Sequence, residues 1–163
     1  LENVLTGMHL ELRSYFLPAF FRLKSYQKAA EQAQEKARRI LDLLGMTDKQ
    51  HIMAKNLAYG DQRRLEIALA LAANPKLLLL DEPAAGMNEK ESADLVFALR
   101  KLKEQGLTLL IVEHDMKVVM NICDWVVVLA EGKKIVEGTP KEVRENPLVI
   151  NTYLGAEDIL EGE

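Results

Sequence analysis

The stretch that decides the fold is Leu77-Leu78-Leu79-Leu80-Asp81-Glu82, four leucines followed directly by two acids. A short, wholly apolar run is typical of a strand buried on both faces of a parallel sheet. Ligands of such sheets bind at the carboxyl ends of the strands, so the two acids are expected at a binding edge. Aspartate there can hold magnesium against nucleotide phosphates, and glutamate can deprotonate an attacking water. The six residues also fit an ordinary strand end followed by an acidic loop.

The segments after Leu80 alternate between helix and strand. We expect a helix from Asn88 to about Gln105, a strand at Leu107–Glu113, a helix at Met116–Ile122, a strand at Trp125–Ala130 and a hairpin strand at Lys133–Glu137. Asn88 with Glu91 three residues later predicts a capping box at the first of these helices. Thr139 and Pro140 predict the cap and the first residue of a last helix. Regular alternation of this kind predicts an α/β fold with a parallel sheet and right-handed crossovers.

The first third of the chain is predicted to be helical. Ser25–Leu44 has no glycine or proline and carries its alanines and leucines at helical spacing, and Gly45 fits a helix end. A second helix is expected after Gly60, with a buried stripe of Leu65, Ala68, Leu69 and Ala72. We therefore divide the chain into a helical subdomain (1–75), an α/β subdomain (76–155) and an acidic tail (156–163).

Composition excludes several classes of protein. The 163 residues are 48% hydrophobic and carry a formal net charge of −4, which argues against a disordered chain and against a dedicated duplex-DNA binder. The single cysteine, Cys123, excludes a disulfide framework and a cysteine zinc site. No apolar run approaches the roughly 20 residues that a membrane-spanning helix needs.

Two further stretches carry polar groups where ligands bind. Glu113-His114-Asp115 follows the second expected strand, and a histidine there can reach a phosphate, although a lone histidine at such a position is more often a satisfied loop residue. Leu57–Arg64 places Gly60 just before a helix, where backbone N–H groups favour an anion. Taken alone, that stretch is also an ordinary helix start.

Together and in this order, the motifs resemble those of the ATP-binding cassette (ABC) ATPases. Ala58–Gln62 matches the signature motif, usually Leu-Ser-Gly-Gly-Gln, and Leu77–Glu82 matches Walker B with the catalytic glutamate. Pro83–Asn88 matches the D-loop, and His114 matches the switch histidine. The resemblance implies a P-loop NTPase-like parallel sheet flanked by helices, with an α-helical subdomain.

The resemblance also implies roles for single residues. Asp81 would help to hold magnesium, Glu82 would be the general base, and His114 would contact the γ-phosphate of ATP. The signature residues would close over the ATP of a partner domain; they are Ala58, Tyr59, Gly60, Asp61 and Gln62. The D-loop residues Ala85, Gly86 and Asn88 would lie at the dimer contact.

Three departures from the family pattern bear on nucleotide binding. Ala58 replaces the usual serine, which removes one hydroxyl contact to phosphate. Asp61 replaces the usual glutamine; it would stabilise the helix as an N-cap, and its charge leads us to expect that it faces away from phosphate. No Gly-x-x-x-x-Gly-Lys-Ser/Thr motif occurs, so we expect the C-terminal two-thirds of an ATPase domain, inactive alone.

The subfamily that the chain resembles is the branched-chain amino acid importers, and within it the larger ATPase subunit. The supporting stretches are Arg63–Ala68, Asp81–Gly86, Glu113–Met116 and Gly138–Gly155. This implies a second nucleotide-binding domain and transmembrane permease subunits as partners, no nucleic acid, and a cytoplasmic place on the inner face of the cell membrane. The lipopolysaccharide-export ATPase is the first alternative, and a non-catalytic binding module acting only in a dimer is the second. Tyr15–Tyr26 is expected near the coupling surface to the permease, or in the core.

Overall fold

The computed structural model describes residues 1–8 and 24–150, and the chain divides into two compact units. The N-terminal unit is Leu1–Glu113 and the C-terminal unit begins at His114. This boundary differs from the predicted one after residue 75, and the division into helical and α/β subdomains stays a prediction. The stretch predicted near the coupling surface, Tyr15–Tyr26, lies outside the residues whose side chains are described.

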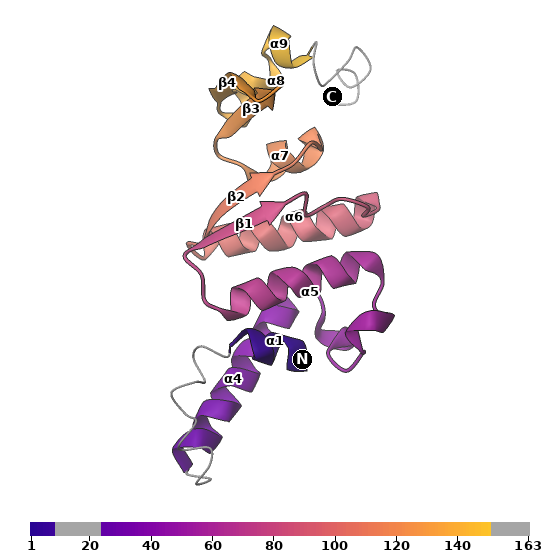
Figure 1. Ribbon diagram of the computed structural model, residues 1–163, viewed down its shortest axis with the longest axis vertical. Coiled ribbons are helices and arrows are strands. Elements are labelled where there is room, and N and C mark those ends of the chain that lie inside the picture. The colour runs from indigo at the N-terminus through magenta and orange to yellow at the C-terminus, as the bar shows by residue number, and fades with distance from the viewer. Residues whose placement is uncertain (9–23, 151–163) are drawn as a thin grey trace. The chain divides into compact units, whose positions relative to one another are not determined.

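The N-terminal unit holds six helical elements and two strands among its described residues (Figure 1). These elements are α1 (Glu2–Gly7), α4 (Lys24–Leu43), the short helices η2 (Thr47–Lys49) and η3 (Ala54–Asn56), α5 (Tyr59–Ala72), β1 (Leu77–Asp81), α6 (Glu89–Glu104) and β2 (Thr108–Val112). The predicted helix at Ser25–Leu44 is thus confirmed as α4, and Gly45 ends it at a φ of 66°. Helices α1, α4 and α5 pack against one another.

The sheet of this unit is a parallel pair. Leu77 lies opposite Thr108 and Asp81 opposite Val112, and α6 connects the two strands. The predicted α/β crossover is confirmed here. The prediction that Leu77–Leu80 is buried on both faces is wrong: Leu78 and Leu80 are buried, whereas Leu77 is 50% and Leu79 65% exposed. No other strand among the described residues pairs with β1 or β2, and the described residues leave the face with Leu77 and Leu79 exposed.

Helix α5 lies between the all-helical part of the unit and the sheet. Its buried residues are Gly60, Arg64, Ile67, Ala68, Leu71 and Ala72. The predicted stripe therefore holds for Ala68 and Ala72 but fails for Leu69, which is 36% exposed. The buried face is turned so that Ile67 and Leu71 point inward, and a charged residue, Arg64, joins them.

The C-terminal unit is built on an antiparallel hairpin. It comprises α7 (Met116–Ile122), β3 (Val126–Ala130), β4 (Lys133–Gly138), α8 (Pro140–Arg144) and α9 (Pro147–Val149). Strand β3 pairs with β4, so the expectation that it extends the parallel sheet is wrong within the described residues. The Glu131-Gly132 turn, with both φ angles positive, brings β4 back beside β3, which confirms the predicted hairpin.

The core of the C-terminal unit is a cluster of valines from its strands and helices. Its buried members are Val119, Val126, Val128, Val143 and Val149. Thr139 caps α8 and Pro140 begins it, as predicted. No helix among the described residues is long and apolar enough to cross a membrane.

Candidate functional site

The two acids predicted at a binding edge do lie at the carboxyl end of β1. Asp81 is the last residue of the strand and Glu82 follows it, and both are exposed. The backbone N–H of Glu82 donates to the carbonyl of Val112 at 2.8 Å, so the end of β2 holds this corner in place. The geometry leaves both carboxylates at the edge where open parallel sheets bind ligands.

Glu82 has an unusual backbone conformation. Its φ is 44°, in the left-handed region that side-chain-bearing residues rarely adopt. Such a conformation costs on the order of 1–2 kcal/mol for an L-residue. Two hydrogen bonds hold it: one from its own N–H to Val112, and one from the N–H of Ala85 to the Glu82 carbonyl at 3.1 Å. Strain retained at one exposed carboxylate points to a functional role for that carboxylate.

A third acid supports the loop after Glu82. The Oε1 atom of Glu113, at the end of β2, accepts a hydrogen bond from the N–H of Ala84 at 2.9 Å. The sequence pattern does not predict this role of Glu113. Its supporting role depends on β1 and β2 ending side by side, which the one-dimensional pattern of Glu113-His114-Asp115 does not state.

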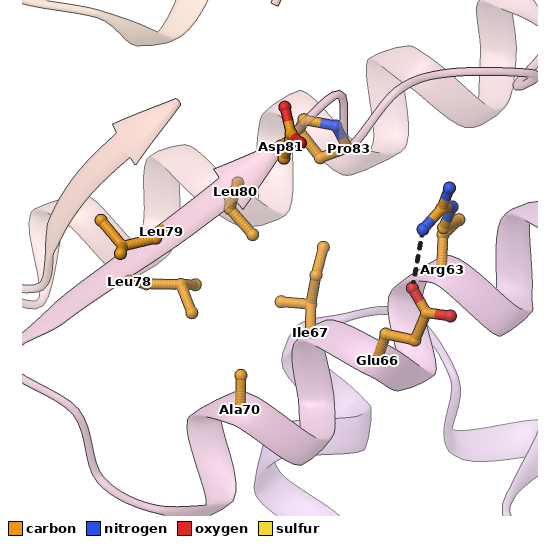
Figure 2. A pocket seen from close by; sticks show the side chains of 9 residues that line it. All are labelled: Arg63, Glu66, Ile67, Ala70, Leu78, Leu79, Leu80, Asp81 and Pro83. Carbon is orange, nitrogen blue, oxygen red and sulfur yellow. Dashed lines mark hydrogen bonds and ion pairs between the residues drawn. The ribbon is translucent and has the colours of Figure 1, made fainter. Parts of the chain in front are cut away.

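A small cavity lies between the end of β1 and helix α5 (Figure 2). Its volume is about 190 Å³, and its lining includes Ile67, Leu78, Leu80 and Asp81. Pockets for drug-sized ligands are about 300 Å³ or more, so this one is too small to enclose a nucleotide. We do not assign a ligand to it.

The rim of this cavity carries an ion pair between Arg63 and Glu66. The two side chains lie 3.0 Å apart, and the Arg63 guanidinium also donates to the Tyr59 hydroxyl at 3.1 Å. Its hydrogen bond to Glu66, which has the larger effect, and its hydrogen bond to Tyr59 raise the pKa of Arg63 above its usual value. The pair therefore fixes Arg63 along α5, on the exposed side of the helix.

The signature stretch forms the N-terminus of α5. Ala58 is the N-cap and provides no side-chain hydrogen bond, so the first N–H groups of the helix have no side-chain cap. Asp61 lies in the first turn of α5 and not at its N-cap, and it pairs with Lys49 at 2.7 Å, which neutralises its charge. Gln62 turns back to donate to the carbonyl of Leu57 at 2.9 Å.

Gly60 is required by a close neighbour. A Cβ atom at this position would lie 3.1 Å from Cδ of Glu91 and 3.2 Å from its Oε1. The carboxylate of Glu91, in the first turn of α6, therefore occupies the space beside the signature glycine. The sequence suggested that Gly60 is small to admit an anion, and the structure adds that it is small to admit Glu91.

The D-loop residues lie against the signature stretch. Gly86 has a φ of 72°, and a Cβ there would lie 2.9 Å from Cε1 of Tyr59. Tyr59, half exposed, stands where the usual motif has its first glycine, so its ring takes up the space beside Gly86. Asn88 begins α6 with the predicted capping box: its side chain accepts from the N–H of Glu91 at 2.9 Å. The structure thus brings Tyr59, Gly60, Gly86 and Asn88 together.

His114 lies in the C-terminal unit and is exposed. It directly precedes Asp115, which caps α7 by accepting from the N–H of Lys117 at 2.8 Å. The cap fixes the backbone beside His114, and the predicted contact of His114 with phosphate stays a prediction.

Comparison with known proteins shows the family of the chain. The sequence model of the ABC transporter family matches residues 4–85, half of the chain, including the signature stretch and the two acids at the end of β1. The chain belongs to the ABC transporter family. A second model, that of the branched-chain amino acid ATP-binding cassette transporter, matches residues 133–159.

Two curated ABC transporter proteins illustrate the likeness. The chain is 43% identical over 155 residues to the high-affinity branched-chain amino acid transport ATP-binding protein BraF of Pseudomonas aeruginosa, covering 94% of this chain and 61% of BraF. It is 40% identical over 156 residues to LivG of Escherichia coli K12, which carries the same description, covering 95% and 61%. The chain thus spans about three-fifths of the length of these relatives.

A solved structure supports the fold. The ADP conformation of MJ1267, an ATP-binding cassette of an ABC transporter, aligns with a TM-score of 0.71 and 32% identity, over 93% of this chain and 62% of MJ1267. The P-loop NTPase-like α/β fold expected from the resemblance is therefore confirmed at the level of the fold.

Proposed function

We propose that this chain is part of the ATP-hydrolysing subunit of an ABC importer for branched-chain amino acids. The observation that carries the proposal is the arrangement at one end of the N-terminal unit: the Walker B acids at the end of β1, and the signature stretch against the D-loop. The identity to BraF and the match of residues 133–159 support the choice of branched-chain amino acids.

ATP and magnesium are the implied cofactors, and the residues present suit them. The described residues contain no group of three or more histidine, cysteine or acidic side chains that could hold a metal by themselves. Magnesium differs from zinc in this respect, because it binds through one or two carboxylates together with phosphate oxygens and water. Exposed Asp81 supplies such a carboxylate. Magnesium bound there would neutralise charge on the phosphates.

The other roles follow from position. Glu82 accepts the proton of the attacking water, and its exposed carboxylate lies one residue after Asp81. His114 contacts the γ-phosphate. The uncapped start of α5, with Ala58, Tyr59 and Gly60, accepts the phosphates of ATP held by a partner domain, because helix N-termini favour negative charge.

Partners follow from the same assignment. A second nucleotide-binding domain holds the ATP whose phosphates meet the signature stretch, and permease subunits in the membrane receive the energy. This assignment implies a position on the cytoplasmic face of the cell membrane. The 163 residues hold no Gly-x-x-x-x-Gly-Lys-Ser/Thr motif, so by themselves they act as a binding module and hydrolyse no ATP.

The alternative assignment is the ATPase of a lipopolysaccharide exporter. It shares the ending of the chain but usually has serine in the signature, where this chain has Ala58. A paired pull-down tests this choice. We expect the chain to bind the membrane subunits of a branched-chain amino acid importer and not those of the lipopolysaccharide exporter. The reverse preference would contradict the proposed substrate class.

Complementation of a full ATPase tests the proposed activity. BraF with a disabled signature motif is mixed with this chain, and steady-state phosphate release is measured. We expect release to be restored by the wild-type chain and by Ala73→Asp, at the far end of α5, but not by Gly60→Asp. The chain alone should release no phosphate; release from it that Glu82→Gln abolishes would contradict the binding-module assignment.

A further inference from the structure

Arg64 is the one buried charged side chain among the described residues. It is 7% exposed and lies in the second turn of α5, four residues after Gly60. Burial of a cation is costly unless partners replace its hydration. Its position therefore requires an explanation from the groups around it.

The partners that Arg64 has among the described residues come from the first two turns of α6. Its Nη2 atom donates to the carbonyl of Glu91 at 3.3 Å and lies 3.6 Å from Oδ2 of Asp94. Its Nε atom has no hydrogen-bond partner among the described residues. The guanidinium thus joins α5 to α6, and part of its hydrogen-bonding capacity is unused.

The segment of α6 that Arg64 holds is also the segment that meets the signature and D-loop residues. The Glu91 carboxylate lies beside Gly60 and accepts from the N–H of Asn88 at 3.0 Å. The Glu91 N–H in turn donates to the side chain of Asn88. One residue, Glu91, therefore contacts Gly60 with its side chain, Asn88 through the capping box, and Arg64 through its carbonyl.

We propose that Arg64 is a positioning residue that locks the signature motif to the D-loop through Glu91, so that the two motifs move as one rigid element. A second contact works in the same direction, because the Tyr59 ring fills the space beside Gly86. The inference rests on the proposed function in one respect: that function supplies the nucleotide that both motifs contact.

The physical case rests on charge and burial. A hydrogen bond from a charged donor is roughly twice as strong as one between neutral groups. Truncation of Arg64 would leave the Glu91 carbonyl and the Asp94 carboxylate without this partner. Release of Glu91 would then loosen both of its other contacts, one on each motif.

Amide hydrogen exchange on the full 163-residue chain tests this lock without nucleotide, so it can fail or succeed independently of the proposed function. The reporters are the N–H of Gln62, bonded to Ala58, and the N–H of Glu91, bonded to Asn88. In Arg64→Met we expect both to exchange roughly tenfold faster, relative to the amides of α4. Arg64→Lys, which keeps the charge, should restore part of the protection.

Arg39→Met is the matched control, because Arg39 is an exposed arginine paired within α4. It should leave both reporters unchanged. Equal acceleration of every amide in Arg64→Met would show a purely structural role and overturn the proposal, as would unchanged exchange at Gln62. Should Arg64→Met not fold, Asp94→Asn decides: faster exchange at both reporters supports the lock, and no change at either overturns it.

Discussion

Helices α5 and α6 begin side by side, and they begin in opposite ways. The start of α6 is closed by its own side chains, because Asn88 and Glu91 exchange hydrogen bonds in a capping box. The start of α5 has Ala58 at the N-cap and no side-chain cap. The N–H groups that α6 satisfies internally are left open in α5 for an outside acceptor.

The difference gives the two helix starts different roles. A closed helix start is a rigid support, whereas an open one is a binding surface for anions. Glu91 connects the two, since it caps α6 and also fills the space beside Gly60. The capping box of α6 therefore shapes the open start of α5.

The largest effect is expected from Gly86→Ala. The substitution forces a side chain into a left-handed backbone and places Cβ 2.9 Å from the Tyr59 ring. We expect a loss of about 2 kcal/mol or more of unfolding free energy, measured by urea denaturation with circular dichroism. Gly106→Ala is the control, since its φ is also positive but no atom lies within 4 Å, so it should lose less. Equal losses in the two variants would show that the Tyr59 contact does not contribute to the loss in Gly86→Ala.

Opening the closed helix start should have a smaller effect. Asn88→Ala removes the side-chain acceptor of the Glu91 N–H and should cost about 1 kcal/mol. Urea denaturation measures the loss, and exchange of the Glu91 amide locates it. A loss without faster exchange at Glu91 would mean that the capping box is not its source.

Closing the open helix start should act in the opposite direction. Ala58→Ser restores the usual residue of the motif and offers a cap to α5, which should raise stability by about 0.5–1 kcal/mol. Ala58→Val, which like alanine is a poor N-cap residue, is the control and should not raise stability. A gain in the valine variant equal to that in the serine variant would contradict the idea that α5 lacks a cap.

The smallest effect is expected at a third helix start, that of α8. Hydrogen bonds from Thr139 lower the pKa of Glu142; the bond from its backbone N–H has the larger effect and the bond from its hydroxyl the smaller. A lowered pKa in the folded state stabilises the protein above the ordinary carboxyl pKa, and this stability disappears as the pH falls through the folded value. Trp125 lies in the same unit, so its fluorescence should report unfolding there.

The control for this pH dependence is Glu142→Gln. Its urea midpoint should lie below that of the wild type at neutral pH and converge with it in acid. A constant difference at every pH would exclude the Glu142 carboxyl as the cause.

Local signals in the sequence predicted most of the elements. The caps at Asn88 and Thr139, the end of α4 at Gly45 and the turn before β4 all depend on neighbouring residues, and each was confirmed. The two acids after Leu80 were placed at a strand end for the same reason.

Features that depend on packing between distant segments could not be predicted. The burial of Arg64 depends on α6, and the support of Ala84 by Glu113 depends on β1 and β2 ending together. The prediction that Leu77–Leu80 is buried on both faces is also wrong, because a run of four leucines does not show whether another element covers the second face. Leu79 is exposed.

The most direct test follows the two helix starts by nuclear magnetic resonance. The isotope-labelled chain is mixed with unlabelled, full-length BraF and a non-hydrolysable ATP analogue, and backbone amides are compared with those in ADP. The account predicts that the ATP analogue shifts the amides of Tyr59 and Gly60, at the open start of α5, while those of Glu89 and Lys90, at the closed start of α6, shift much less. Unchanged amides at Tyr59 and Gly60, or equal shifts at both helix starts, would contradict it.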